Sequence, residues 1–296
     1  APAPTALAPP AADLLNPAAV ERFIALTHDR YAAALGDLLG STVVAMFTDE
    51  PDLLGRRPAR GARPWTDGLL EELTSTLGWT PDDVRAWLPA LWNDLGPTGA
   101  RFRAVYEACV QQRLSRVFYA AQAAWCRAHG IALTGHPARG NQMGVLREFD
   151  WPGQDAVWRW VLPWDGTGLE GAESVTAKAA SSMALLRGGR PALTEVFGAY
   201  GWGLTLDEVK WLLDWHLARG VDTYVLHAYF YSVRGQRAFE SEPDLGLHNP
   251  WWPNIGVLHD YLGRMSLLLR RGRRVVRVGI LADPHDLPWR TARRLY

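Results

Sequence analysis

The chain has 296 residues and as many basic as acidic side chains, so its formal net charge is zero. This balance carries no electrostatic signature of a nucleic-acid-binding or anionic-membrane-binding protein, and no run of about 18 apolar residues predicts a membrane span. The unusual feature is 15 tryptophans, which fill a core or line a carbohydrate or ligand cleft.

The two ends of the chain differ in composition from its middle. Residues 1–12 are rich in Pro and Ala and lack the basic and apolar regions of a signal peptide, so we interpret them as a linker or a cut end. We expect residues 13–272 to form the main domain and residues 273–296 to begin a following one. Cys109 and Cys126 lie too far apart on one predicted helix to pair, and the compartment stays open between periplasm, exterior and cytoplasm.

Helices are predicted where apolar residues recur at a spacing near 3.6. The first, over residues 17–39, starts with Asn16 as N-cap and Pro17 at its first position. Thr205, with Glu208 three residues later, starts another helix that Gly220 closes. The remaining predicted helices span residues 67–77, 81–92, 99–128, 181–186, 255–271 and 289–296.

Short apolar and β-branched runs between the helices predict strands that are buried on both faces, as in parallel sheets. These strands span residues 42–48, 131–135, 173–178, 192–196 and 222–226, with a later one at 274–281. Residues 137–170 show little periodicity and are expected to form a long connection of the kind that often builds a lid or binding loop.

Strands alternating with helices predict an α/β fold with a parallel sheet. Polar residues cluster where the strands end, which is the catalytic face of a (β/α)8 TIM barrel. We therefore expect a TIM-barrel catalytic domain that lacks its first strands in this chain and contributes about strands four to eight, followed by the start of another α/β domain. A doubly wound open sheet is the alternative.

Two glutamates stand at ends of these strands. Glu50 follows the first strand, and Glu195 lies in the fourth, just before the aromatic and glycine-rich residues 197–202. An unpaired buried carboxylate is costly, whereas two carboxylates across one cleft are what glycoside hydrolysis requires. We therefore predict that Glu50 and Glu195 are catalytic, with a salt-bridged acid as the alternative for each.

Several polar and aromatic residues near the strand ends are predicted to contact a sugar substrate. For the histidines the alternative is a structural hydrogen bond, and for the aromatic residues it is core packing. Because the sequence shows no third ligand near the histidines, we predict no zinc site. The predicted substrate-binding residues are Asp49, His136, Trp151, Gln154, Tyr200, Trp202, His227 and Tyr229.

Four blocks in order resemble large bacterial glycosyl hydrolases of the α-L-rhamnosidase type, glycoside hydrolase family 106 and its relatives. The segments from Leu206 to Arg219 and from His227 to Ser232 are similar to the same proteins, so the resemblance covers nearly the whole chain. The four blocks lie at residues 15–28, 47–51, 151–159 and 194–202.

The resemblance implies a (β/α)8 catalytic domain within a longer parent chain that continues into β-sandwich modules. It implies a pair of glutamates, Glu50 and Glu195 by motif match, that hydrolyses the substrate with inversion, and a calcium ion that helps to hold sugar hydroxyls. By analogy with other barrel glycosidases, Glu50 is expected to be the proton donor. Residues 137–141 after His136 contain no acidic cluster, which is a departure from the calcium site expected of such enzymes.

The leading hypothesis is a glycosidase that acts on plant or bacterial polysaccharide and cleaves an α-L-rhamnoside. One alternative is a retaining β-galactosidase-like glycosidase. Another, from a different functional class, is a non-catalytic carbohydrate-binding barrel.

Overall fold

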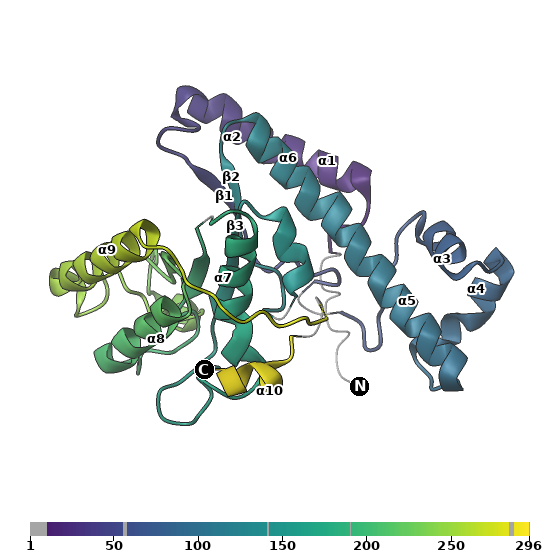
Figure 1. The fold of residues 1–296 in the computed structure, drawn as a ribbon. Helices are drawn as coiled ribbons and strands as arrows, with labels where there is room; N and C mark the ends of the chain where they lie inside the picture. Colours follow the sequence, from purple (N-terminus) through teal and green to yellow (C-terminus); the bar gives the residue numbers. More distant parts are fainter. Residues whose placement is uncertain (1–10, 56–57, 141, 190, 284–286, 296) are drawn as a thin grey trace. The chain divides into compact units, whose positions relative to one another are not determined.

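The computed structural model describes residues 11–55, 58–140, 142–189, 191–283 and 287–295 (Figure 1). The chain forms two compact units. Unit 1 consists of residues 1–44 and 51–131, and unit 2 consists of residues 45–50 and 132–296. Unit 2 thus takes its first strand from a stretch that lies within unit 1 in the sequence. No helix in the described ranges is long and apolar enough to cross a membrane.

Unit 1 opens with the predicted N-terminal helix, which the structure divides in two. The Asn16 side chain accepts a hydrogen bond from the Ala18 N–H, which confirms the predicted N-cap. The helix is interrupted at Thr27, whose hydroxyl donates to the Phe23 carbonyl and so competes with the helical hydrogen bonding. The elements are α1 (Pro17–Leu26), α2 (His28–Leu35) and the short 3-10 helix η1 (Gly36–Leu38).

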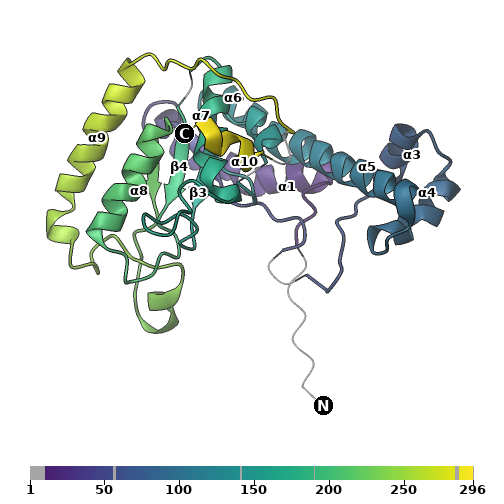
Figure 2. The ribbon, with the colours of Figure 1, turned by 60° about the horizontal axis from the view of Figure 1, so that its bottom comes forward.

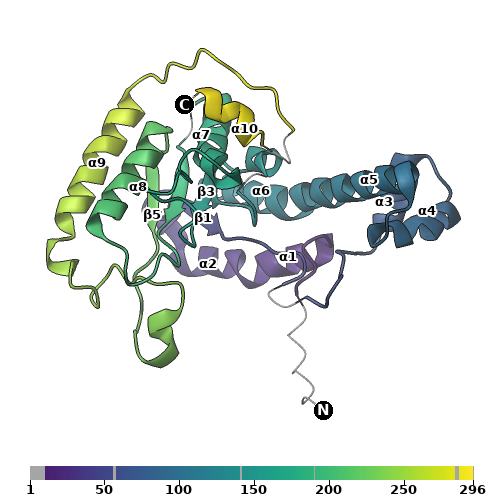
Figure 3. The same ribbon diagram turned by 90° about the horizontal axis from the view of Figure 1, so that it is seen from below.

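The rest of unit 1 is also helical. The predicted long helix is one continuous run that begins at Gly96 and includes a π-helical turn, and α3 packs beside its first part (Figure 3). Buried Arg113 links α5 to its surroundings: it pairs with Glu72 at 2.8 Å and donates to the carbonyls of Leu15 and Asp67. The elements are α3 (Leu69–Leu77), α4 (Pro81–Trp87), η2 (Leu88–Leu91), α5 (Gly96–Leu114), the π turn η3 (Ser115–Tyr119) and α6 (Ala120–Ala128).

Unit 2 is built on a five-stranded sheet in which every strand is parallel to its neighbours and the strands follow one another in chain order. Sequential parallel strands are the connectivity of a β/α barrel. Four of the five strands fall where the sequence predicted them. They are β1 (Ala45–Thr48), β2 (Ala132–Gly135), β3 (Trp151–Ala156), β4 (Leu193–Val196) and β5 (Thr223–Leu226).

The prediction of the third strand at residues 173–178 is wrong. That stretch forms the 3-10 helix η5 (Ala172–Val175) and the start of α7 (Thr176–Leu186), which packs on β3. Its small residues suit a helix that lies close against the sheet. The third strand is Trp151–Ala156 instead, within the connection expected at residues 137–170. Pro152 and Gly153 concealed it, since both residues argue against a central strand.

The predicted strand at residues 274–281 is also wrong. Residues 274–282 are extended but belong to no strand, because within the described ranges no neighbour hydrogen-bonds with them as a ladder. Arg274 instead anchors the segment by donating to the carbonyls of Ser181 and Gly220. The side chains of Val275 and Leu281 stay exposed.

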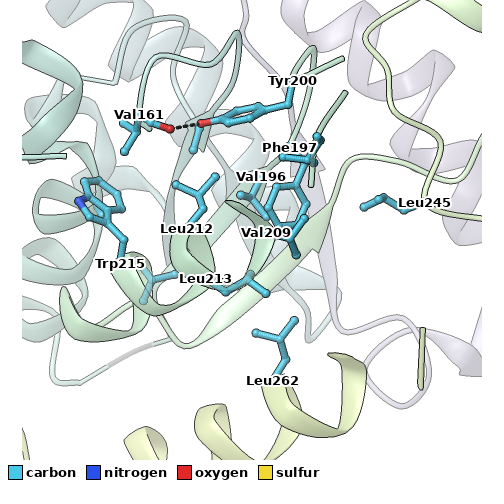
Figure 4. Packing of buried hydrophobic residues seen from close by; sticks show 14 residues of the cluster. Val161, Val196, Phe197, Tyr200, Val209, Leu212, Leu213, Trp215, Leu245 and Leu262 are labelled. Carbon is cyan, nitrogen blue, oxygen red and sulfur yellow. Dashed lines mark hydrogen bonds between the residues drawn. The ribbon is translucent and has the colours of Figure 1, made fainter. Parts of the chain in front are cut away.

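The helices of unit 2 cover the sheet with an apolar layer. Thr205 and Glu208 form the predicted capping box of α8, and α8 lies beside α9 (Figure 2). Phe197, Leu212 and Leu213 are fully buried in the shared core (Figure 4). The remaining elements are η4 (Met143–Glu148), α8 (Leu206–Ala218), η6 (Gly235–Phe239), η7 (Trp252–Asn254), α9 (Gly256–Arg271), α10 (Trp289–Ala292) and η8 (Arg293–Leu295).

Candidate active site

Two acidic residues lie side by side on neighbouring strands of unit 2. The register pairs Asp155 of β3 with Glu195 of β4, so their side chains emerge on the same face of the sheet. Like charges directly opposite one another destabilise a sheet. A proton or a cation must therefore offset at least one of these carboxylates.

His136 reaches the same place from the end of β2. No side chain could replace the hydrogen of Gly135, since a Cβ there would lie 2.0 Å from the Thr48 carbonyl oxygen of β1. This close approach brings the next residue against β1, where the His136 N–H donates to the Thr48 carbonyl at 3.1 Å. His136 is thereby fixed beside Asp49 and Glu50, which directly follow β1.

The imidazole of His136 is 1% exposed and faces several carboxyl groups. Its Nε2 lies 3.0 Å from Glu195 Oε2 and 3.5 Å from Asp49 Oδ1. Burial acts to lower the pKa of His136, but the hydrogen bond to Glu195 and the charges of Asp155, Glu195 and Asp49 outweigh it and raise the pKa to about 9. The ring is therefore cationic at neutral pH and acts as a hydrogen-bond donor to Glu195.

Glu50 and Asp155 form the other half of the cluster. One donor atom each from Glu50, His136 and Asp155 lies within 4.8 Å of the other two. Burial raises the pKa of Asp155 to about 8; the charge of His136 opposes this rise, and the charges of the nearby carboxylates add to it. Burial also raises the pKa of Glu50, with a hydrogen bond from Asp155 acting in the opposite direction. The pair therefore retains a proton near neutral pH.

The backbone at Glu50 is in the left-handed region, with φ of +37°. Such a conformation is uncommon for a residue other than glycine, costs on the order of 1 kcal/mol and often occurs at functional sites. The turn directs the chain away from β1 immediately after the acidic pair.

A pocket of about 220 Å³ opens beside this cluster. Glu50 and Asp155 contribute to its wall, together with the indole of Trp160, which is 46% exposed. At about 30 Å³ for each water molecule, the volume holds roughly seven waters, which is closer to one sugar ring than to a polysaccharide segment. The other lining residues are Pro137, Ala138, Arg139, Gly140, Ala172 and Glu173.

The structure does not support substrate contacts for two of the predicted binding residues. Gln154 is 1% exposed and is bonded on the helix-covered face to Thr176 and His216. Tyr200 is 2% exposed, and its hydroxyl donates to the Val161 carbonyl within the core (Figure 4). Strand alternation explains Gln154, because its neighbour Asp155 takes the face that carries the acids. Core packing was the alternative for Tyr200.

The six other predicted binding residues also lie outside the set that lines the pocket within the described ranges. Asp49 and His136 belong to the acidic cluster beside the pocket. Trp202 donates its indole N–H to the Ala238 carbonyl, and Tyr229 is 54% exposed with its ring edge-on to Trp252. Trp151 is partly buried in β3. His227 follows β5 and lies against Gly198, and its Nδ1 is buried without a hydrogen-bond partner.

Of the nine residues that line the pocket within the described ranges, only Glu50 belongs to the predicted site set. Two acids and one indole among the other eight bear on sugar chemistry. Asp155 was not assigned to the site because its strand was not predicted, since Pro152 and Gly153 indicated a loop. Trp160 lies among the many tryptophans of the connection, with nothing in its spacing to single it out, and Glu173 lies in the stretch that was predicted to be a strand. Glu173 shares the pocket wall with Asp155 because η5 leads into α7, which packs on β3.

The acidic cluster also bears on the calcium ion implied by the resemblance. Carboxylate oxygens are the ligands that Ca²⁺ prefers, and among the described residues the buried Oδ1 of Asp155 has no hydrogen-bond partner. Two sets of three side chains each have one atom within 4.8 Å of the others, Glu50 with His136 and Asp155, and Asp49 with His136 and Glu195. Because His136 keeps its proton, only the two carboxylates of each set are available to a calcium ion. The sequence predicted no zinc site, and the calcium ion stays an implication of the resemblance, toward which this cluster offers carboxylate oxygens.

Comparisons with known proteins agree with this architecture. A solved structure, a rhamnosidase from Novosphingobium sp. PP1Y, superposes with a TM-score of 0.60 at 21% sequence identity over 88% of this chain. The shared fold is an α/β architecture with a curled parallel sheet, a half-barrel, surrounded by helices. The chain covers 25% of the length of that protein. The comparison with curated proteins gave no match.

The family is established by the sequence itself. The sequence pattern of the α-L-rhamnosidases of glycoside hydrolase family 106 matches residues 1–286, which is nearly the whole chain. With the half-barrel and its acidic site in place, the chain belongs to this family of α-L-rhamnosidases.

Proposed function

We propose that this chain carries the catalytic site of an α-L-rhamnosidase that cleaves the bond between a rhamnose residue and its neighbour in plant or bacterial polysaccharide. The observation that best supports this proposal is that Glu50 and Glu195 both lie close to His136. The family match, which spans residues 1–286, supports it independently. Each glutamate has a carboxylate oxygen within 4.8 Å of a ring nitrogen of His136.

In this proposal the two glutamates have different roles because their surroundings differ. Glu50 lines the pocket, and burial raises its pKa, as suits an acid that protonates the departing oxygen. Glu195 accepts a hydrogen bond from the His136 ring, which fixes the direction of its carboxyl group and suits a carboxylate that activates water. His136 positions Glu195 and balances its charge, and Asp49 contacts the same His136 nitrogen.

We further propose inversion at the anomeric carbon. An inverting enzyme needs room for a water molecule between sugar and base, which requires carboxyl groups about 6.5–9.5 Å apart, whereas retention requires about 5–5.5 Å. Each glutamate lies within 4.8 Å of a ring nitrogen of His136, an arrangement that is compatible with the wider spacing.

We assign the five strands to positions four to eight of a TIM barrel. The support is their unbroken chain order in a parallel sheet and the likeness in fold to a rhamnosidase of which this chain covers 25%. The site residues themselves all belong to unit 2.

A calcium ion, when bound, would be held by Asp155 and Glu50 and would supply positive charge that orients sugar hydroxyl groups. A carboxylate that binds Ca²⁺ does not also carry a proton. The roles of Glu50 as ligand and as proton donor therefore exclude each other, and the following experiment distinguishes them.

The test is hydrolysis of aryl α-L-rhamnosides by the intact protein and by E50Q and E195Q, with the exposed Glu240 changed to Gln as the matched control. We expect E195Q to lose about 10²- to 10⁴-fold in kcat/KM on every substrate, the usual contribution of an acid or base. E50Q should lose as much on phenyl rhamnoside but far less on a dinitrophenyl rhamnoside, whose leaving group needs no proton. E240Q should match the parent.

Full activity of both site variants would overturn the catalytic assignment. Equal losses by E50Q on both leaving groups, together with weaker calcium binding, would make Glu50 a ligand rather than the acid. Sugar binding without hydrolysis of any substrate would favour a carbohydrate-binding barrel.

A further inference from the structure

Glu173 is an acidic residue of the pocket that does not belong to the cluster around His136. It lies in η5, which directly precedes α7, and its side chain lines the pocket together with Asp155 and Trp160. Burial alone accounts for the raised pKa of its carboxyl group. In the described part of the chain, no hydrogen bond or ion pair engages that carboxyl group.

The position of Glu173 is fixed through its backbone rather than its side chain. The Thr176 hydroxyl lies 3.0 Å from the Glu173 carbonyl and 2.9 Å from Oε1 of Gln154 on β3. The loop before it closes over the same spot, since a Cβ on Gly140 would lie 2.5 Å from Thr176 and 3.5 Å from a carboxylate oxygen of Glu173. A rigid backbone thus presents a carboxyl group that makes no internal bond.

A half-buried polar group without a protein partner has a free-energy cost that a bound ligand can remove. A sugar offers hydroxyl groups that donate and accept hydrogen bonds, and an apolar ring face that suits an indole. Resting on the proposed glycosidase function, we propose that Glu173 binds a hydroxyl group of the sugar in this pocket while Trp160 contacts its apolar face, so that the two residues determine which sugar is accepted.

The structural alternative for Glu173 would be a role in folding. Such a role predicts bonds from its carboxyl group to neighbouring elements. Glu170, three residues earlier, makes a bond of this kind, since its carboxylate pairs with Arg293 at 2.8 Å on the surface. Glu170 is therefore the matched control, an acid of the same loop that lies outside the pocket.

The experiment compares the intact parent protein with E173A, E173Q, W160A and E170Q on aryl α-L-rhamnoside and on its 2-, 3- and 4-deoxy analogues. Loss of a hydrogen bond to a charged group should lower kcat/KM of E173A about 10- to 100-fold, and E173Q should lose less because its amide still bonds a hydroxyl. One deoxy analogue should remove the difference between parent and E173A, since it lacks the bonded hydroxyl. E170Q should behave as the parent.

The inference is overturned if E173A and E173Q stay within twofold of the parent on every substrate while E195Q is inactive, or if no deoxy analogue removes the deficit. Loss in E173A beside full activity of E50Q and E195Q would leave the inference standing and reject the catalytic pair. If the parent hydrolyses no rhamnoside, the affinities of the parent and of E173A for L-rhamnose, measured by calorimetry, test the inference instead. A tenfold weaker affinity of E173A then supports the subsite, and equal affinity or no binding by the parent rejects it.

Discussion

Single residues around the site take opposite protonation states because their partners differ. His136 faces carboxylates and holds its proton, whereas His216, fully buried on the helix-covered side of the sheet, has its pKa lowered to about 3. Burial is the main cause for His216; the hydrogen bond to the Leu212 carbonyl opposes it, and the charge of Arg219 adds to it. The Nδ1–H therefore donates to Leu212, and Nε2 accepts from the Gln154 amide.

His216 should make the stability of the protein depend on pH. Its pKa is lower in the folded chain than the unfolded value of 6.5, so its contribution is complete above pH 6.5 and falls as the pH drops toward 3. The expected loss is up to about 1.4 kcal/mol for each pH unit. Urea unfolding of the parent between pH 7 and pH 5 should show a steeper decline than that of H216Q, and parallel declines would refute this prediction.

At the residue scale, the sequence allowed the acids at strand ends to be predicted but not their partners. Glu50, His136 and Glu195 follow or end recognisable strands, so their meeting at one edge follows from parallel topology. Asp155 lies in a strand that contains Pro and Gly. Its side chain and that of Gln154 point to opposite faces of the sheet because side chains alternate along a strand. Without the strand, the sequence alone could not distinguish the acid in the pocket from the amide behind the sheet.

Among the elements, β3 connects the pocket to the framework through one side chain. The Gln154 amide donates to Thr194 of β4 and to His216 of α8, and its oxygen accepts from Thr176 of α7. Thr194 and Thr176 adjoin the segments that carry Glu195 and Glu173. The network therefore sets the positions of three elements from behind the sheet.

Replacement of Gln154 by Leu should destabilise the protein and misplace the acids. Thr176 and Thr194 keep second partners in the carbonyls of Glu173 and Glu195, but Nε2 of His216 loses its amide donor. A buried polar group left without a partner costs about 1–3 kcal/mol, and we expect a loss of that size. Chemical denaturation measures the loss, and kcat on an aryl rhamnoside measures the misplacement. Exposed Gln236, changed to Leu, is the control, and equal stability of the two variants would contradict the network.

The third strand shows why element prediction failed where it did. Helix starts such as Thr205 with Glu208 depend on local hydrogen bonds and were predictable to the residue. The identity of β3 depends on its neighbours in space. Glycine is required at position 153, because the Gly135 carbonyl of β2 lies too close to leave room for any side chain. In the sequence this requirement is visible only as a glycine, and a glycine more often indicates a turn than a central strand.

On the scale of the whole molecule, the two units are interleaved along the chain. Unit 2 contains residues 45–50, which carry β1, Asp49 and Glu50, while the residues on either side of that stretch belong to unit 1. A single cut between the units therefore cannot preserve the sheet. The domain boundaries expected near residues 12 and 272 stay predictions.

A fragment of residues 132–296 should not fold cooperatively, because β2 would lose the strand that pairs with it along its whole length. We expect a broad thermal transition by circular dichroism, in contrast to a sharp one for residues 11–296, which keep both units. A sharp transition of the shorter fragment at the same temperature would show that β1 is dispensable.

The most direct test of the central claim is the crystal structure of the intact E195Q variant with an aryl α-L-rhamnoside bound. We predict that the glycosidic oxygen lies within about 3 Å of a Glu50 carboxyl oxygen and that the anomeric carbon faces residue 195 across a water-sized gap. A rhamnoside bound away from both residues, or one with its glycosidic oxygen out of reach of Glu50, would contradict the account.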